Sequence, residues 1–207
     1  MERSNLPKAS LGRLPQYLQF LTSLPQDRFP NISATTIAKE LALGDVQVRK
    51  DLAMISGIGK PKIGYVTSDL IEDLEDALGC NKLTPAVLVG AGKLGRALLD
   101  YNGFEEYGVQ ITAAFDCNEQ IIRFNQMSKD ILPISQLKQF CKEHEIKIGI
   151  ITVGSGSAQA VCDAMLEAGI TAIWNFAPCR LNVPSEILVK QENLALSLAY
   201  LNSQISK

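Results

Sequence analysis

The chain has 207 residues, which suits one large or two small domains. An apolar share of 46% argues against a disordered chain, and no apolar run approaches the roughly 18 residues of a membrane helix. The chain has a single histidine and five scattered cysteines, which argues against a metal site. The first thirteen residues contain no hydrophobic core of a signal peptide. Together with the scattered cysteines, this predicts a cytoplasmic protein with reduced thiols.

The net charge of −2 is unevenly distributed along the chain. Residues 1–68 contain nine Lys and Arg against five Asp and Glu, so this segment carries +4 and the remainder carries −6. A basic segment at the start of an otherwise acidic chain indicates a polyanionic partner for that segment.

The N-terminal third has the spacing and capping signals of short helices. Leucines at helical spacing predict a first helix over 12–24, and its proline fits the first turn. We expect Ser33 to cap a second helix that ends at Gly44, and Asp45 to cap a third over 46–56.

The third predicted helix has an apolar face and a polar, basic face. Val48, Leu52 and Ile55 share the inward face. The outward side carries one amide and two cations, on Gln47, Arg49 and Lys50. Two short helices of this kind predict a helix-turn-helix, in which the amide suits adenine and the cations suit guanine or phosphate. The alternative is a plain three-helix bundle with a solvated charged face.

Glycines at 57, 59 and 64 enclose Lys60 and Lys62, and this predicts a short β-hairpin. After a helix-turn-helix such a hairpin is a wing, whose lysines can contact phosphate or the minor groove. Ser68 is then expected to cap an acidic helix over 69–78, and 79–84 reads as an inter-domain linker.

The rest of the chain alternates between strand and helix patterns. The predicted strands are 85–90, 109–116, 147–153 and 170–176. The predicted helices are 93–102, 135–145 with Ser135 as its cap, and 156–168. This alternation predicts an α/β domain with a Rossmann-type parallel sheet.

A glycine-rich motif joins the first of these strands to the first of these helices. The motif consists of Gly90, Ala91, Gly92, Lys93, Leu94 and Gly95. Gly90 permits the tight turn, Gly92 lets a pyrophosphate approach, and Gly95 lets the helix pack closely on the strand. Asp116 follows about 20 residues later, ends the next strand and suits the two ribose hydroxyls. Its charge would repel a 2′-phosphate, which favours NAD(H) over NADP(H).

Two further loops lie at the carboxyl ends of predicted strands, where such folds bind ligands. From them we expect Thr152, Val153, Asn175 and Phe176 to approach the nicotinamide end. The alternative is that both are ordinary strand-to-helix loops.

The last segment, 192–206, reads as an amphipathic helix. Its apolar stripe contains Leu194, Leu198, Leu201 and Ile205. A terminal helix of this kind either covers its own sheet or packs on a second subunit.

Several motifs together resemble the Rex family of redox-sensing transcriptional repressors. They are RLPQYLQFL (13–21), QVRKDL (47–52), GAGKLGRALLDYNGF (90–104) and WNFAP (174–178). The resemblance implies a winged-helix DNA-binding domain over 1–79, an NAD(H)-binding domain over 80–190 and a helix over 191–207 exchanged between the subunits of a homodimer. It also implies binding to a palindromic operator when NADH is scarce and release when NADH is abundant.

The resemblance also assigns roles to individual residues. Gln47, Arg49 and Lys50 match the recognition helix, and Lys60 and Lys62 fall in the wing. Tyr101 matches a tyrosine whose contacts differ between redox states, and Arg13 matches an arginine near the subunit contacts.

This chain departs from the family pattern at Pro61-Lys62, where an Arg-Gly pair is usual, and at Asn193, where an aspartate is common. A divergent NAD(H) sensor with weak or no DNA binding is therefore an alternative. A dehydrogenase fits less well, because His144 is flanked by glutamates on a predicted helix and no second catalytic domain follows. We predict neither catalytic nor metal-binding residues.

Overall fold

The computed structural model describes residues 7–25 and 27–205, so part of the N-terminal segment considered for a signal peptide lies outside it. The chain divides into two units, Met1–Lys82 and Leu83–Lys207, and each is described by itself. Among the described residues, none of the helices combines the length and the apolarity that crossing a membrane requires.

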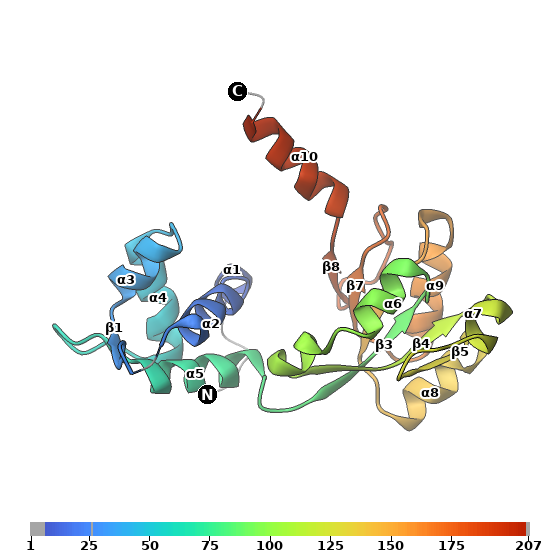
Figure 1. The fold of residues 1–207 in the computed structure, drawn as a ribbon, viewed down its shortest axis with the longest axis horizontal. Coiled ribbons are helices and arrows are strands. Elements are labelled where there is room, and N and C mark those ends of the chain that lie inside the picture. The colour runs from blue at the N-terminus through green and yellow to red at the C-terminus, as the bar shows by residue number, and fades with distance from the viewer. Residues whose placement is uncertain (1–6, 26, 206–207) are drawn as a thin grey trace. The chain divides into compact units, whose positions relative to one another are not determined.

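The first unit is helical, with one small antiparallel pair of strands (Figure 1). Its described elements are α1 (Lys8–Leu11), α2 (Leu14–Ser23), β1 (Asn31–Ile32), α3 (Ala34–Glu40), α4 (Asp45–Ser56), β2 (Tyr65–Val66) and α5 (Thr67–Leu78). The pairing of β1 with β2 joins the residues that directly follow the predicted wing to the strand before α3.

The helix starts differ from the predictions at three places. Helix α2 begins at Leu14 after a separate turn of helix, because Pro15 lacks an N–H and fits only a first turn. Asp45 is the first residue of α4 and not its cap, a position that Gly44 takes. Ser68 lies inside α5, which begins at Thr67, whose hydroxyl donates to the carbonyl of Phe29 in the segment before β1.

One apolar core holds the first unit together. Leu14, Leu18 and Leu21 of α2 are buried, as their spacing predicted. They pack with Ile37 of α3, Val48 and Leu52 of α4, and Leu70 and Leu74 of α5. The predicted cap at Ser33 is confirmed, since its hydroxyl accepts the Thr36 N–H at 3.0 Å.

The second unit is a six-stranded parallel sheet with helices on both faces. Its described elements are β3 (Thr84–Val89), α6 (Lys93–Leu99), a 3-10 helix (Asn102–Tyr107), β4 (Val109–Asp116), α7 (Glu119–Arg123), β5 (Asp130–Pro133), a 3-10 turn (Ile134–Gln136), α8 (Leu137–Glu143), β6 (Ile148–Ile151), α9 (Ser155–Glu167), β7 (Ala172–Asn175), β8 (Leu188–Gln191) and α10 (Leu194–Ile205). The strand order is β5-β4-β3-β6-β7-β8, and all five pairings are parallel. This is the order of the dinucleotide-binding fold, so the predicted fold class is confirmed.

Alternate residues of β3 send their side chains to opposite faces. Val87 and Val89 join the core under α8 and α9, whereas Leu88 joins the core under α6 and α7. The sheet is therefore covered on both sides, as Figure 1 shows.

The sequence patterns missed or misplaced a few elements of this unit. Strands β5 and β8 and helix α7 were not predicted, because each is short and has only two consecutive aliphatic residues. Helix α6 ends at Leu99, short of residue 102. Ser135 is not a helix cap, because it lies inside the 3-10 turn that precedes α8.

Helix α10 extends away from the sheet of its own unit (Figure 1). Its apolar side chains are exposed, with Leu198 at 68% and Ile205 at 84% of their surface accessible. The predicted helix is present, and within the described residues it does not cover its own sheet.

Candidate functional site

The glycine-rich loop has the geometry that its motif predicted. Gly90 has φ of 105°, and a Cβ there would lie 2.7 Å from Val153 Cγ1. A Cβ on Gly95 would lie 2.0 Å from the carbonyl oxygen of Gly90, so the helix and the turn are in direct backbone contact. A Cβ on Gly92 would meet no atom within 4 Å. Open space thus lies over the middle glycine, and tight packing surrounds the other two.

Asp116 is held against this loop by two backbone hydrogen bonds. Its Oδ2 accepts the N–H of Ala91 at 2.8 Å, and its Oδ1 accepts the N–H of Asn118 at 2.8 Å. Each carboxylate oxygen can accept a further hydrogen bond. The carboxylate is therefore positioned beside the loop with acceptor capacity left for hydroxyl groups.

The end of β6 is bonded to the same loop. Thr152 donates its hydroxyl to the Gly90 carbonyl at 2.7 Å, and its N–H bonds Val89. Strands β3 and β6 are neighbours whose onward connections run in opposite directions across the sheet. Ligands of open α/β sheets bind at this kind of switch point. Thr152 and half-buried Val153 therefore lie against the glycine loop.

The other residues predicted for the cofactor occupy α6 and the turn after it. Lys93 and Leu94 are exposed in the first turn of α6. Tyr101 is 58% exposed, with its ring centroid 5.0 Å from that of Phe104. The row of rings continues to Trp174 at 5.7 Å and from there to Phe176 at 4.5 Å. Aromatic contacts thus connect Tyr101 to the end of β7.

Asn175 is fully buried, and its amide is used inside the protein. Its Oδ1 accepts the Ala177 N–H at 3.0 Å, and its Nδ2 donates to Gln191 Oε1 at 2.8 Å and to the Cys179 carbonyl at 3.1 Å. The side chain therefore shapes the loop after β7. Half-buried Phe176 is the neighbour that borders the surface.

The predicted helix-turn-helix is formed by α3 and α4. The side chains of Gln47, Arg49 and Lys50 are exposed on α4. Arg49 pairs with Asp45 one turn earlier, at 2.8 Å, and Asp45 also accepts the Thr35 hydroxyl at 2.7 Å. This pair is solvent-exposed, so it contributes about 0.5 kcal/mol or less and Arg49 can exchange it for another anion.

The predicted wing is a tight hairpin. Lys60 and Gly64 exchange two backbone hydrogen bonds of 2.8 Å, and Lys62 at the tip has φ of 66°. Lys60 and Lys62 are both exposed. A groove of about 700 Å³ runs between the wing and α4, and its lining includes Lys50 and Arg49. The cations predicted for DNA thus share one groove.

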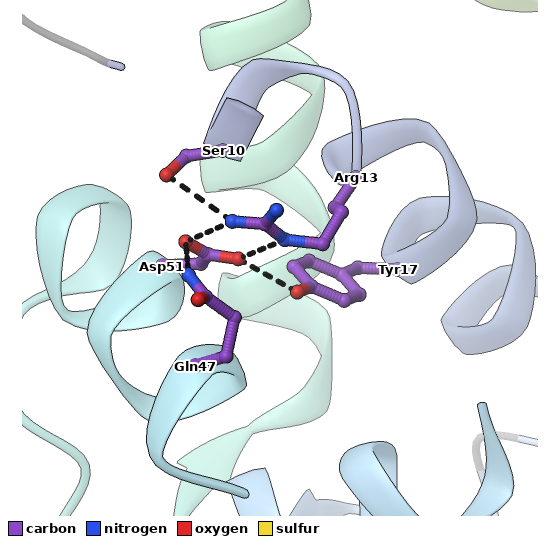
Figure 2. Close-up of polar contacts among 5 residues, drawn as sticks. All are labelled: Ser10, Arg13, Tyr17, Gln47 and Asp51. Atoms are coloured by element: carbon purple, nitrogen blue, oxygen red, sulfur yellow. Dashed lines mark hydrogen bonds and ion pairs between the residues drawn. The ribbon is translucent and has the colours of Figure 1, made fainter. Parts of the chain in front are cut away.

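A buried ionic network ties α4 to the start of α2, and it was not predicted (Figure 2). Asp51 is fully buried. Arg13 donates to it at 2.7 and 3.0 Å, Tyr17 donates its hydroxyl at 2.8 Å, and Gln47 donates its amide at 3.1 Å. Arg13, which the resemblance assigned to the subunit contacts, is therefore bonded inside its own unit.

The network keeps Asp51 ionised. Burial alone would raise the pKa of Asp51, but the hydrogen bonds from Arg13, Tyr17, Ser10 and Gln47 outweigh it and lower that pKa to about 2. Burial, and next the hydrogen bond to Asp51, raise the pKa of Tyr17 to about 12. The carboxylate is thus a permanent acceptor at physiological pH.

A sequence signal for this network existed. Asp51 lies three residues after Val48 and four before Ile55, in the middle of the apolar face of α4. A carboxylate at such a position requires a buried partner. Tyr17 and Arg13 are 34 and 38 residues away, however, and no local spacing identifies them as its partners.

The sequence patterns predicted neither catalytic nor metal-binding residues, and His144 is the only histidine of the sequence. His144 is exposed and packs its ring on Phe140 at 4.2 Å. Within 7–25 and 27–205, no group of three or more His, Cys, Asp or Glu side chains is arranged to hold a metal ion.

Known proteins resemble both units. A family model described as "Putative DNA-binding protein N-terminus" matches residues 5–53, and one described as "CoA binding domain" matches residues 81–179. The redox-sensing transcriptional repressor Rex of Treponema denticola is 41% identical over 202 residues, which cover 97% of this chain and 96% of that protein.

The chain belongs to the Rex family. The Rex repressor of Porphyromonas gingivalis is 36% identical over 95% of this chain and 90% of its own length. Solved Rex structures agree over both units. A crystal structure of RSP, a Rex-family repressor, with β-NAD+ and operator DNA has a TM-score of 0.89 and 29% identity, covering 98% of this chain and 93% of that one. RSP with β-NADH has a TM-score of 0.87 and 28% identity, covering 98% and 95%.

Proposed function

We propose that this Rex-family chain is a transcriptional repressor that binds operator DNA and leaves it when NADH binds, so that it reports the NADH/NAD+ ratio. The observation that carries the proposal is that one chain contains both kinds of site. Its glycine loop lies at the switch point of the sheet, bonded to Asp116, and its helix α4 exposes Gln47, Arg49 and Lys50. RSP has been solved with β-NAD+ and operator DNA and with β-NADH.

The cofactor of this proposal is NAD(H). The pyrophosphate would lie over Gly92, where the open space is, against the loop from Gly90 to Gly95. Asp116 would accept the ribose hydroxyls and repel a 2′-phosphate. Thr152, Val153 and Phe176 would border the nicotinamide end. Asn175 would hold the loop that contains Phe176, and Tyr101 would sense the bound cofactor through the row of rings.

The DNA partner would be contacted by α4 and the wing. Gln47, Arg49 and Lys50 would enter the major groove, and Lys60 and Lys62 would hold phosphates. Because positive side chains line one groove, binding would weaken as salt rises.

A homodimer would supply two recognition helices. The exposed apolar side chains of α10 need a partner surface, and a second copy of this chain supplies one by exchange of this helix. Two copies of α4 would meet two half-sites of a palindrome about 34–36 Å apart. Such a repressor performs no chemistry on its cofactor and acts in the cytoplasm, where DNA and NADH are found.

An NAD(H) sensor without DNA binding is the second candidate. The observation that favours it is Asp45, a carboxylate in the groove that already pairs with Arg49 and would repel phosphate. For this chain to bind DNA through Arg49, that side chain would have to exchange Asp45 for a phosphate or a base.

Selection from a random-sequence DNA duplex library with NAD+ present tests the proposal. The enriched duplex is then titrated by fluorescence anisotropy with NAD+, with NADH and without nucleotide. We expect NADH to weaken binding about tenfold or more, which requires a matching preference of NADH for the free protein. NADPH is the matched control, and Asp116 should make it far less effective. No enrichment would support the DNA-free sensor, and equal binding in all three states would contradict redox control.

A further inference from the structure

The amide of Gln47 has a defined orientation, set by the buried carboxylate beneath it. Gln47 is an exposed residue of α4, yet its Nε2 donates to Asp51 Oδ1 at 3.1 Å (Figure 2). An ionised carboxylate only accepts hydrogen bonds, so it must face the nitrogen of an amide and not the oxygen. The pKa of about 2 keeps Asp51 ionised at every physiological pH. Chemistry therefore decides which end of the amide turns inward.

Asp51 itself cannot turn away from this arrangement. Arg13 clamps both carboxylate oxygens, with Nε on Oδ2 at 2.7 Å and a terminal nitrogen on Oδ1 at 3.0 Å. The Tyr17 hydroxyl of α2, which begins directly after Arg13, adds a third donor at 2.8 Å. The group that orients Gln47 is thus anchored to α2, and Gln47 is tied to it across one turn of α4.

The other end of the Gln47 amide is unused. Within residues 7–25 and 27–205, Oε1 of Gln47 has no hydrogen-bond partner. Its neighbours Arg49 and Lys50 carry only donors. On the exposed surface of α4, Gln47 therefore supplies an acceptor, whereas Arg49 and Lys50 supply donors.

We propose that Asp51 is a positioning residue that presents the carbonyl oxygen of Gln47 to the major groove, so that Gln47 binds a base whose exocyclic amino group faces that groove. Adenine and cytosine offer such a donor in the major groove, whereas guanine and thymine offer acceptors at the equivalent edge. An outward acceptor can therefore accept a hydrogen bond from adenine or cytosine, whereas the acceptors of guanine and thymine repel it. This inference rests on the proposed binding of operator DNA and adds which bases Gln47 reads.

The first arm of the test compares sequence profiles. The full-length protein and its Gln47→Ala variant each select from a random-sequence duplex library. Every base pair carries one such amino group, on adenine or cytosine, so a preferred pair fixes which base carries it and on which strand. We expect the unsubstituted protein to prefer one base pair at one position of each half-site through Gln47. In the variant, that position alone should lose its preference, and the rest of the site should remain.

The second arm removes the amino group from the DNA. In the enriched duplex, the Gln47-dependent adenine is replaced by purine, or the cytosine by pyrimidin-2-one, which lack only that group. The unsubstituted protein should bind the altered duplex roughly 3- to 10-fold more weakly, the effect of one hydrogen bond. Gln47→Ala should bind both duplexes equally, which removes the effect of the analogue on the duplex itself.

The third arm tests Asp51. Asp51→Asn offers Gln47 both a donor and an acceptor, so the amide is free to reverse. With helical content confirmed by circular dichroism, the variant should lose discrimination between duplexes with and without the amino group, while a merely weakened fold would lower both affinities in parallel. If the variant does not fold, the base-analogue comparison decides.

Each outcome separates this inference from the proposed function. No enrichment by the unsubstituted protein would overturn both. Enrichment with a profile that Gln47→Ala leaves unchanged, or equal binding of the unsubstituted protein to duplexes with and without the amino group at the Gln47-dependent base pair, would overturn the role of Gln47 and leave the repressor intact. Discrimination that persists in a folded Asp51→Asn protein would overturn the positioning role.

Discussion

At the scale of single residues, Asp51 is the group whose protonation the fold opposes most clearly. Its pKa of about 2 lies below the ordinary value of 3.8 because donors from three sides outweigh its burial. Because the pKa of Asp51 is lower in the folded chain than in the unfolded chain, its ionised carboxylate stabilises the folded state above about pH 4. This stabilisation is lost as pH falls from about 4 to about 2. The full shift corresponds to about 2 kcal/mol.

Replacing Asp51 with Asn should remove this pH dependence. We expect the variant to be about 2 kcal/mol or more less stable at neutral pH, because it also leaves Arg13 without its counter-ion. The gap between variant and unsubstituted protein should narrow as pH falls from 5 to 3. Urea unfolding at pH 7, 5, 4 and 3 measures it. If the two proteins lost stability in parallel over this pH range, Asp51 would not be the carboxylate with the lowered pKa.

At the scale of elements, the junction of β3 and α6 contains two glycines with different roles. Gly95 is in backbone contact with Gly90, whereas Gly92 faces open space with φ of −69°. The first serves packing, and the second leaves room for a ligand.

Substitution to alanine should separate these two roles. Gly95→Ala should destabilise the protein by about 1–3 kcal/mol, because its Cβ meets a backbone oxygen that cannot move away. Gly92→Ala should keep its stability and bind NADH at least tenfold more weakly, because the methyl fills the space over the loop. Urea unfolding and calorimetric titration distinguish them. Unchanged NADH affinity in Gly92→Ala would place the pyrophosphate elsewhere.

The same scale shows how far the sequence patterns reach. The leucine stripe of α2, the Ser33 cap and the glycine motif were predictable because each depends on residues close in the chain. Strands β5 (DILP) and β8 (LVKQ) were not, since each has only two consecutive aliphatic residues, whereas the equally short β6 and β7 lie in longer apolar runs. The Arg13–Asp51 pair was not either, because it joins positions 38 residues apart that only the folded helices bring together.

At the scale of the whole molecule, α10 is the feature that a lone subunit leaves unsatisfied. Leu194, Leu198 and Leu201 are each about 60% exposed or more, on a helix that stands clear of its own sheet. Burying them against a second copy would contribute about 1.5–3 kcal/mol per side chain.

A charge placed on this stripe should prevent dimer formation. Leu198→Asp should shift the protein from dimer to monomer or aggregate at micromolar concentration, because the carboxylate would be buried without a partner. Ser203→Asp, on the other side of α10, is the matched control and should leave the dimer intact. Analytical ultracentrifugation reports both. If the unsubstituted protein were a monomer at the same concentration, the expectation that α10 forms a dimer contact would be wrong.

The row of rings from Tyr101 to Phe176 gives the molecule an optical reporter. Trp174 is the only tryptophan in the sequence, and it lies 4.5 Å from Phe176 and bonds Glu192 just before α10. Reduced nicotinamide absorbs in the near ultraviolet, where indole emits, while the oxidised ring does not. Energy transfer from this one indole would therefore quench its emission only when the reduced cofactor is present. The redox state of the bound nucleotide could then be followed in solution without a dye.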